Sequence, residues 1–435
     1  MKFSQANSAA CRKKCLMKPW GCILVVFLSV SAASVPAEEV ELTLLERLGK
    51  EIFNDKISVP AESMSCADCH APEAGWTSPD ATLNETVGII PGATGFSANR
   101  SPNSAAYAAF SPLFDYDEAL GFYGGNMWGG QVHGYRLGHP TSDQALFPIV
   151  SPVEHGNNEI DVLMTIAESN YAYLWAKVFD APVDTETTTG PFEFFGGVPY
   201  ADYYKVGLVL GAYQMSKEVS QFSSKYDLYL QGQVALTDLE MDGLAVFNGK
   251  GHCSSCHISE PGPEGEPPLF TDNRFWNIGV PKNPALPTYA FDPNFIDLGL
   301  GQTLRDMADP NTFSPFAEHW RSEPFAPPTM LAMTDEQLLA YAAESDGKFH
   351  TPTLRNITKA PYPEFVKAHM HNGAIKTLLD AIELHNARDA FPDPPEFAGN
   401  METELIGNLG LTLEEKLSLI AFLGTLTDGY DPAGP

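Results

Sequence analysis

The sequence predicts a mainly α-helical protein made of two similar halves in tandem, with long loops. Two segments of the same pattern support the tandem arrangement: GKEIFND (49–55) precedes CADCH (66–70), and GLAVFNG (243–249) precedes CSSCH (253–257). Each predicts the end of a helix followed by a loop with two cysteines and a histidine. The 36 glycines and 35 prolines are spread along the chain, which predicts many loops between the helices.

The first residues have the pattern of an export signal. Basic residues precede an apolar stretch at 22–30, and small residues follow at 35–37. This pattern predicts a signal peptide over residues 1–37, cleaved after Ala37, and therefore a periplasmic protein. The apolar stretch is too short for a permanent anchor, and no later stretch is long and apolar enough, so we expect no membrane anchor.

The remaining chain is strongly acidic. Without residues 1–37 it has 21 basic and 55 acidic residues, a formal net charge of −34. Such a chain repels nucleic acid and anionic membranes and favours a basic or neutral partner. We therefore expect no nucleic-acid partner.

Only four cysteines lie outside the signal segment, and both pairs stand in the pattern C-x-x-C-H. In this pattern the two thiols form thioethers to the haem vinyl groups, and the adjacent histidine coordinates the iron. A zinc half-site or a redox dithiol does not require that histidine, and disulfides would not explain it at both places. We therefore expect two covalently bound haem c groups, one held by Cys66, Cys69 and His70 (the first site) and one by Cys253, Cys256 and His257 (the second site).

The two sites predict two tandem cytochrome c-like haem domains. We place the first domain over residues 38–233 and the second over residues 234–435. A loop-like insertion at 181–199 precedes a predicted helix over 204–230. The stretch from about 281 to 346 is rich in proline and acidic residues, so we expect a long surface excursion with little helix.

An amphipathic helix is predicted in the second half, over residues 377–388. Leu378, Ile382 and His385 fall at helical spacing on one side, and Thr377 can cap the start. A lone histidine on an apolar face is by itself most often a core residue with a satisfied hydrogen bond. It becomes a candidate ligand only with a partner elsewhere in the chain.

The segment QALFPIVSPVEHG (144–156), together with the paired C-x-x-C-H sites, resembles the bacterial dihaem cytochrome c peroxidase and MauG family. That family has a Gln, a Pro four residues later and a Glu ten residues after the Gln beside its peroxide-binding haem. Gln144, Pro148 and Glu154 have these spacings. Further family segments are matched in the family's order by NRSPNSAAYAAF (99–110), MWGGQVHGYRLG (127–138), GKFHTPTLRN (347–356) and MHNG (370–373).

The resemblance implies that hydrogen peroxide reacts at the His70 haem. Peroxide cleavage needs a group that moves a proton from one oxygen to the other, and Glu154 is the acid–base candidate. Gln144 would position peroxide or water, and Pro148 would shape the pocket. Trp128 would relay electrons between the haems, although an aromatic residue there is as often simple packing.

The chain departs from the family at two places. The family's peroxidases have a histidine in the loop before the RN-x-P element that must leave the iron before peroxide binds, whereas the loop at 77–103 has neither His nor Met. Hence we expect a first haem that is five-coordinate or water-ligated, as in the MauG branch. The family's inter-haem calcium site has Asn where this chain has Arg100, so calcium binding would depend on backbone carbonyls.

In the family, the sixth ligand of the second haem lies on the helix after the motif that MHNG matches. Counting from His371 puts this ligand at His385, which implies a low-spin haem with two histidine ligands and a lower potential than a His/Met haem. Met370 and His371 are the alternative ligands, but they precede the helix. Four histidines without such a partner are interpreted as structural or solvated: His252, His319, His350 and His369.

Three functions follow from this interpretation. The first is a periplasmic dihaem peroxidase that reduces hydrogen peroxide with electrons from a small redox protein, a cytochrome c or a cupredoxin. The second is a MauG-like enzyme that oxidises Trp or Tyr of a partner protein; the missing displaceable histidine and axial Met favour it. The third, a non-catalytic dihaem electron carrier, is disfavoured by the open first site and by Glu154.

Overall fold

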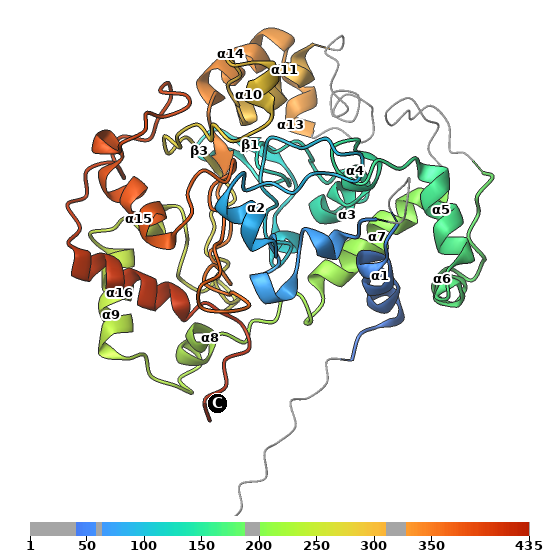
Figure 1. Cartoon of the computed structure of the whole chain (residues 1–435), viewed down its shortest axis with the longest axis horizontal. Coiled ribbons are helices and arrows are strands. Elements are labelled where there is room, and N and C mark those ends of the chain that lie inside the picture. The colour runs from blue at the N-terminus through green and yellow to red at the C-terminus, as the bar shows by residue number, and fades with distance from the viewer. Residues whose placement is uncertain (1–40, 58–62, 188–200, 310–327, 435) are drawn as a thin grey trace, which may run out of the picture. The chain divides into compact units, whose positions relative to one another are not determined.

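The computed structural model describes residues 41–57, 63–187, 201–309 and 328–434. The predicted signal peptide, His319 and most of the predicted 181–199 insertion lie outside these residues. Within them, helices far outnumber strands, which confirms the mainly α prediction (Figure 1). The helices are α1 (Leu44–Asn54), α2 (Ala81–Glu85), α3 (Pro140–Gln144), α4 (Leu146–Val150), α5 (Glu159–Glu168), α6 (Ala172–Phe179), α7 (Ala201–Met215), α8 (Lys225–Leu230), α9 (Asp238–Asn248), α10 (Thr288–Phe291), α11 (Leu300–Ala308), α13 (Pro328–Leu331), α14 (Asp335–Ser345), α15 (Leu378–Ala387) and α16 (Leu413–Gly424).

The strands form two small antiparallel pairs. β1 (Asp115–Asp117) pairs with β2 (Gly121–Tyr123), and β3 (Phe275–Trp276) pairs with β4 (Phe349–His350). The second pair joins segments more than 70 residues apart, with Phe275 opposite His350. No helix in the described parts of the chain is long and apolar enough to cross a membrane.

The repeated sequence segments correspond to a repeated helix crossing. α1 packs against α7, and α9 packs against α16 (Figure 1). At both crossings a glycine allows the close approach: a Cβ at Gly49 would overlap the Val209 carbonyl, and one at Gly243 would overlap the Ser418 carbonyl. The predicted helix ends at 49–55 and 243–249 are confirmed, since α1 ends at Asn54 and α9 at Asn248, and the glycine that begins both segments has a packing role.

Buried apolar side chains form three clusters. The first joins α1 to α4–α7, the second joins the two strand pairs to α11, α13 and α14, and the third joins α8, α9 and α16. The first site lies beside the first cluster, and Cys253 of the second site packs against the third. The division into domains at residues 233 and 234 stays a prediction.

Two helix predictions are wrong in the described chain. The helix expected over 204–230 is two helices, because Ser224 forms a capping box with Asp227 that starts α8 anew after α7 has ended at Met215. The stretch at 281–346 is also more helical than expected, because α11 and α14 pack together in the second cluster. The prediction rested on the proline and acidic content of this stretch and did not consider the apolar residues at helical spacing in α11. These are Leu300, Leu304, Met307 and Ala308.

The predicted helix at 377–388 is confirmed as α15. Thr377 caps it, since its side chain accepts a hydrogen bond from the Asp380 amide at 3.0 Å. Leu378 and Ile382 lie on the face that packs against the third cluster. α15 therefore presents the face that carries His385 to the same region as the second site.

Candidate functional site

Both cysteine motifs fold into the same tight turn. Cys66–Asp68 and Cys253–Ser255 each form one 3₁₀ turn. The amide of His70 donates to the carbonyl of the first cysteine at 3.0 Å, and the amide of His257 makes the matching bond at 2.9 Å. None of these four cysteines forms a disulfide, and burial raises the pKa of each thiol to about 12. Uncharged, part-buried thiols suit an apolar group better than a bare metal ion.

A backbone carbonyl holds the histidine ring of each turn. His70 Nδ1 lies 3.2 Å from the Trp76 carbonyl oxygen, and His257 Nδ1 lies 2.9 Å from the Phe270 carbonyl oxygen. Because a carbonyl only accepts, each Nδ1 carries the proton and each Nε2 keeps its lone pair. Burial lowers the pKa of both imidazoles, to about 4 for His257. Two neutral histidines with oriented Nε2 atoms are what iron coordination requires.

A cavity of about 670 Å³ lies beside the first turn. The cysteines and histidine of the first site line it. So do all four of the catalytic candidates from the sequence: Trp128, Gln144, Pro148 and Glu154. The volume and the adjoining thiols fit a haem, and the candidates would surround it.

Glu154 is positioned by the turn after α4. Its amide donates to the Ser151 carbonyl at 3.1 Å, and its own carbonyl accepts from the Ala93 amide at 2.7 Å. Burial raises the pKa of the Glu154 carboxyl from 4.5 to about 7, and a hydrogen bond with the Ser151 side chain lowers it only in part. Cys66, Cys69 and Glu154 line the same cavity, and a Glu154 charge would raise the pKa of both thiols. A carboxyl of pKa near 7 can take up and release a proton at neutral pH.

Gln144 and Pro148 reach this cavity from two consecutive short helices. Gln144 is the last residue of α3, and Pro148 lies in the first turn of α4, where a missing amide proton leaves no helical hydrogen bond unmade. The Pro148 carbonyl accepts from the His155 amide at 3.2 Å and so closes the turn that carries Glu154. Pro148 therefore holds the shape of the cavity wall.

The second site faces α15. His385 Nδ1 lies 2.8 Å from the Ala381 carbonyl oxygen one turn earlier, so its Nε2 also keeps the lone pair. Cys253 of the second site and Leu378 and Ile382 of α15 pack against the same apolar cluster, and a charge on His385 would lower the pKa of His257. Burial lowers the pKa of His385 itself. Two neutral imidazoles beside the apolar side chains of Leu378 and Ile382 fit a haem with two histidine ligands.

Trp128 lines the first cavity and is in contact with a second aromatic ring, which stacks on a third. Its indole Nε1 donates to the Ser101 carbonyl at 2.8 Å, and its ring meets the His371 ring edge to face with centroids 6.4 Å apart. His371 stacks on Phe349 with centroids 3.5 Å apart. The relay role of Trp128, and the choice of His385 over Met370 or His371 as ligand, stay predictions.

A buried ion pair occupies the place where the family resemblance puts calcium. Arg100 Nε and Nη2 each donate to the Asp297 carboxylate at 2.7 Å. Although burial raises the pKa of Asp297, the Arg100 charge and hydrogen bonds hold it at about 2. Across the described ranges, no three His, Cys, Asp or Glu side chains gather as a metal site. The guanidinium would repel a divalent cation, so these side chains do not fit calcium.

Three further residues that line the first cavity have donor atoms for iron and were not predicted from the sequence: Met64, Met127 and His155. His155 directly follows Glu154, which was the signal that could have identified it, and burial lowers the pKa of its imidazole to about 4. Thioether sulfur and imidazole nitrogen are both donors that haem iron accepts. Each of the three is therefore a candidate sixth ligand of the first haem, in competition with the expectation that this haem is five-coordinate or water-ligated.

The histidines interpreted as structural or solvated differ in burial. His252 is exposed, His350 is half-buried and His369 is buried, and loss of solvent around the last two lowers the pKa of each to about 4. His350 belongs to β4 and lies edge to face on Phe275, with centroids 5.3 Å apart. These contacts agree with a packing role for His350.

Several known proteins are similar to this chain in sequence or in fold. The family model described as di-haem cytochrome c peroxidase matches residues 44–235. The methylamine utilization protein MauG of Paracoccus denitrificans (strain Pd 1222) is 29% identical to this chain over 94% of each protein. This chain is thus similar to the di-haem cytochrome c peroxidases over residues 44–235 and to MauG over nearly its whole length.

Further relatives support the same family. The cytochrome-c peroxidase IdrP2 of Denitromonas iodatirespirans is 26% identical, covering 87% of this chain and 80% of that protein. The crystal structure of the diheme peroxidase BthA from Burkholderia thailandensis E264 matches with a TM-score of 0.65 at 27% identity, over 88% of this chain and 86% of BthA. These similarities support an oxidoreductase of the di-haem peroxidase type.

Proposed function

We propose that this protein is a periplasmic dihaem peroxidase that reduces hydrogen peroxide to water at the first site. Electrons enter through the second site from a small redox protein, a cytochrome c or a cupredoxin. The sequence of residues 1–37 supports export, and the net charge of −34 left after that segment favours a basic donor. The two haem c groups are held by the first and second sites, with His385 as the sixth ligand of the second.

The observation that carries the proposal is the Glu154 carboxyl, with a pKa of about 7, in the cavity of the first site. A haem bound there supplies the iron at which peroxide is reduced. Glu154 as a carboxylate takes a proton from one peroxide oxygen and returns it to the other, which then leaves as water. In total, two electrons and two protons convert one peroxide into two waters.

The neighbours of Glu154 orient the substrate. The Gln144 side chain has both amide donors and a carbonyl acceptor, so it can hold peroxide through hydrogen bonds without exchanging a proton. Pro148 keeps the wall rigid, and Trp128 leads from this cavity to the His371 and Phe349 rings. Electrons would follow these rings from the second site.

A MauG-like reaction on a partner protein is the second candidate. The 29% identity to MauG over 94% of each chain favours it, as does the lack of His and Met in the loop at 77–103. In that case the oxidising equivalents from peroxide would be used on a Trp or Tyr of the partner. The same Glu154 chemistry would start both reactions.

Three measurements distinguish the functions. Stopped-flow mixing with hydrogen peroxide should change the absorbance of the first haem within the mixing experiment; an unchanged spectrum would leave only the electron carrier. Steady-state oxidation of two reduced cytochrome c molecules per peroxide would support the peroxidase. Slow cytochrome oxidation together with a mass change in an exported protein encoded beside this one would support the MauG-like reaction instead.

A further inference from the structure

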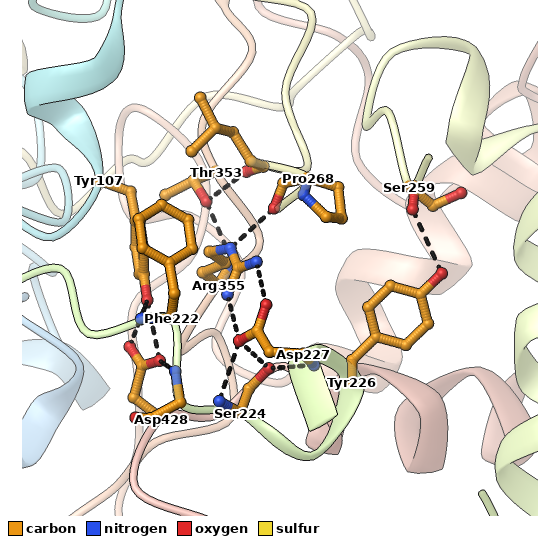
Figure 2. Close-up of polar contacts among 12 residues, drawn as sticks. Tyr107, Phe222, Ser224, Tyr226, Asp227, Ser259, Pro268, Thr353, Arg355 and Asp428 are labelled. Atoms are coloured by element: carbon orange, nitrogen blue, oxygen red, sulfur yellow. Dashed lines mark hydrogen bonds and ion pairs between the residues drawn. The ribbon is translucent and has the colours of Figure 1, made fainter. Parts of the chain in front are cut away.

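A buried arginine, Arg355, lies in the segment GKFHTPTLRN and has no part in the proposed reaction. It is 2% exposed, and its Nη1 and Nη2 atoms donate to the Asp227 carboxylate at 2.9 and 2.7 Å (Figure 2). Its guanidinium also lies over three aromatic rings, 4.9 Å from the Tyr107 centroid, 4.7 Å from that of Phe222 and 5.9 Å from that of Phe270. The charge is therefore fully paired, and the guanidinium is held in one orientation.

The third guanidinium donor reaches the loop of the second site. Arg355 Nε donates to the Pro268 carbonyl at 2.8 Å (Figure 2). Two residues earlier, Thr353 Oγ1 donates to the Leu269 carbonyl at 2.7 Å and accepts from the Arg355 amide at 3.1 Å. The next carbonyl in the chain, that of Phe270, accepts from His257 Nδ1 at 2.9 Å. Three consecutive carbonyls are thus each held by one side chain.

The backbone at Phe270 needs such support. Its φ of +54° lies in the left-handed region, which a bulky side chain adopts only where the surroundings impose it. Phe270 is fully buried between the Arg355 guanidinium and the Phe247 ring, whose centroid is 6.0 Å away. Without the bonds to Pro268 and Leu269, this residue could relax and turn its carbonyl away from His257.

We propose that Arg355 and Thr353 are positioning residues that fix the Phe270 carbonyl and thereby the orientation of the His257 imidazole toward the second haem. The inference rests on the proposed role of His257 as an iron ligand and not on the peroxidase reaction. A hydrogen bond from Nδ1 to a carbonyl sets the plane of the imidazole and makes Nε2 a stronger donor to iron. A stronger donor favours the oxidised iron, so these bonds lower the potential of the second haem.

The first site provides an internal reference. His70 is held by the Trp76 carbonyl, and neither Arg355 nor Thr353 bonds to that residue in the hydrogen bonds described for either side chain. A change confined to the second haem therefore reports on His257. A change in both haems would report on a general loosening of the fold.

The test uses the haem-loaded protein and three variants at two positions, Thr353 and Arg355. Thr353→Val removes only the hydroxyl that holds Leu269, and Thr353→Ser keeps it as the matched control. Arg355→Lys keeps the charge but cannot hold Asp227 and Pro268 at once. The midpoint potentials of both haems are measured by spectroelectrochemical titration, and the g values of the second haem by electron paramagnetic resonance.

We expect Thr353→Val and Arg355→Lys to raise the potential of the second haem and to shift its g values, with the first haem unchanged and Thr353→Ser like the wild type. An unchanged second haem in Thr353→Val, or equal shifts at both haems, would overturn the proposal. If Arg355→Lys does not fold because Asp227 loses part of its pairing, Thr353→Val decides alone. A protein that shows no peroxidase activity would refute the proposed function and leave these potentials measurable.

Discussion

Replacing Glu154 by Gln should cost activity and, at alkaline pH, increase stability. The wild-type carboxyl has to be ionised to take a proton from peroxide, and burial resists that ionisation, since it raises the pKa to about 7. Glutamine has nearly the same shape and no charge to bury. Glu154→Gln therefore allows two effects of the carboxyl to be measured: its contribution to the rate with peroxide, and the loss of folding stability caused by burying its charge.

The size of both effects follows from the pKa. One pH unit below about 7, roughly one carboxyl in ten is ionised, so the wild-type rate with peroxide should rise about tenfold from pH 6 to its plateau. Glu154→Gln should lower the plateau by about 10²- to 10⁴-fold, the usual contribution of an acid–base group, and remove the inflection near pH 7.

The free energy of unfolding at alkaline pH should be higher in Glu154→Gln than in the wild type, although the activity is lower. The carboxyl titrates near 4.5 in the unfolded chain and near 7 in the folded one, so between these values only the folded state keeps the proton. The free energy of unfolding therefore falls as the pH rises from about 4.5 to about 7 and stays low above it. The full difference corresponds to roughly 3 kcal/mol, which Glu154→Gln should recover at pH 8 and not at pH 4.

The assay combines peroxide kinetics from pH 5 to 9 with guanidinium unfolding at pH 4 and pH 8. Glu159→Gln is the matched control for the kinetics, because burial also raises the pKa of Glu159 to about 7 although this residue does not line the cavity. The control should keep the wild-type rate and its inflection. The reasoning fails if Glu154→Gln reacts with peroxide at the wild-type rate at pH 8, or if Glu159→Gln loses as much.

The remaining predictions concern the two haems and the Arg100–Asp297 ion pair, which lines the first cavity. His385→Met should shift the spectrum of the second haem and raise its potential; if neither moves, His385 is not the ligand. The oxidised protein as isolated should show a high-spin first haem by electron paramagnetic resonance, and a purely low-spin spectrum would point to Met64, Met127 or His155 as a sixth ligand. Dialysis against a calcium chelator should leave both haem spectra and the peroxide rate unchanged, because Arg100 already provides the positive charge beside Asp297; a lost rate would show that calcium is needed.

Features encoded in short segments could be predicted from the sequence. The two C-x-x-C-H turns and the capped helix with His385 depend on neighbours within a few residues, and the structure has both. Gln144, Pro148 and Glu154 also line one cavity, because Gln144 ends α3 and only the short helix α4 and the turn after it separate Gln144 from Glu154.

Features that join distant segments could not be predicted. Arg100 and Asp297 are 197 residues apart, and Arg355 and Asp227 are 128 apart, so no local pattern pairs them. The helices within 281–346 were missed for a related reason: their apolar residues are a minority of a segment rich in proline and acid, and only packing between α11 and α14 shows which face is buried. The overall composition of such a segment reflects its many exposed residues and does not show which few apolar residues are buried.

The helix crossings at Gly49 and Gly243 also bear on the order in which the chain can assemble. α1 needs α7, which ends at Met215, whereas α9 has to wait for α16, which starts at Leu413. A chain that crosses a membrane from its N-terminus can thus close the helix pair beside the first site while the second half is still unthreaded. The second site stays open to the haem-attaching machinery until the last helix arrives, so a chain shortened to end before Leu413 would lose α16, and this loss would affect the two haems unequally.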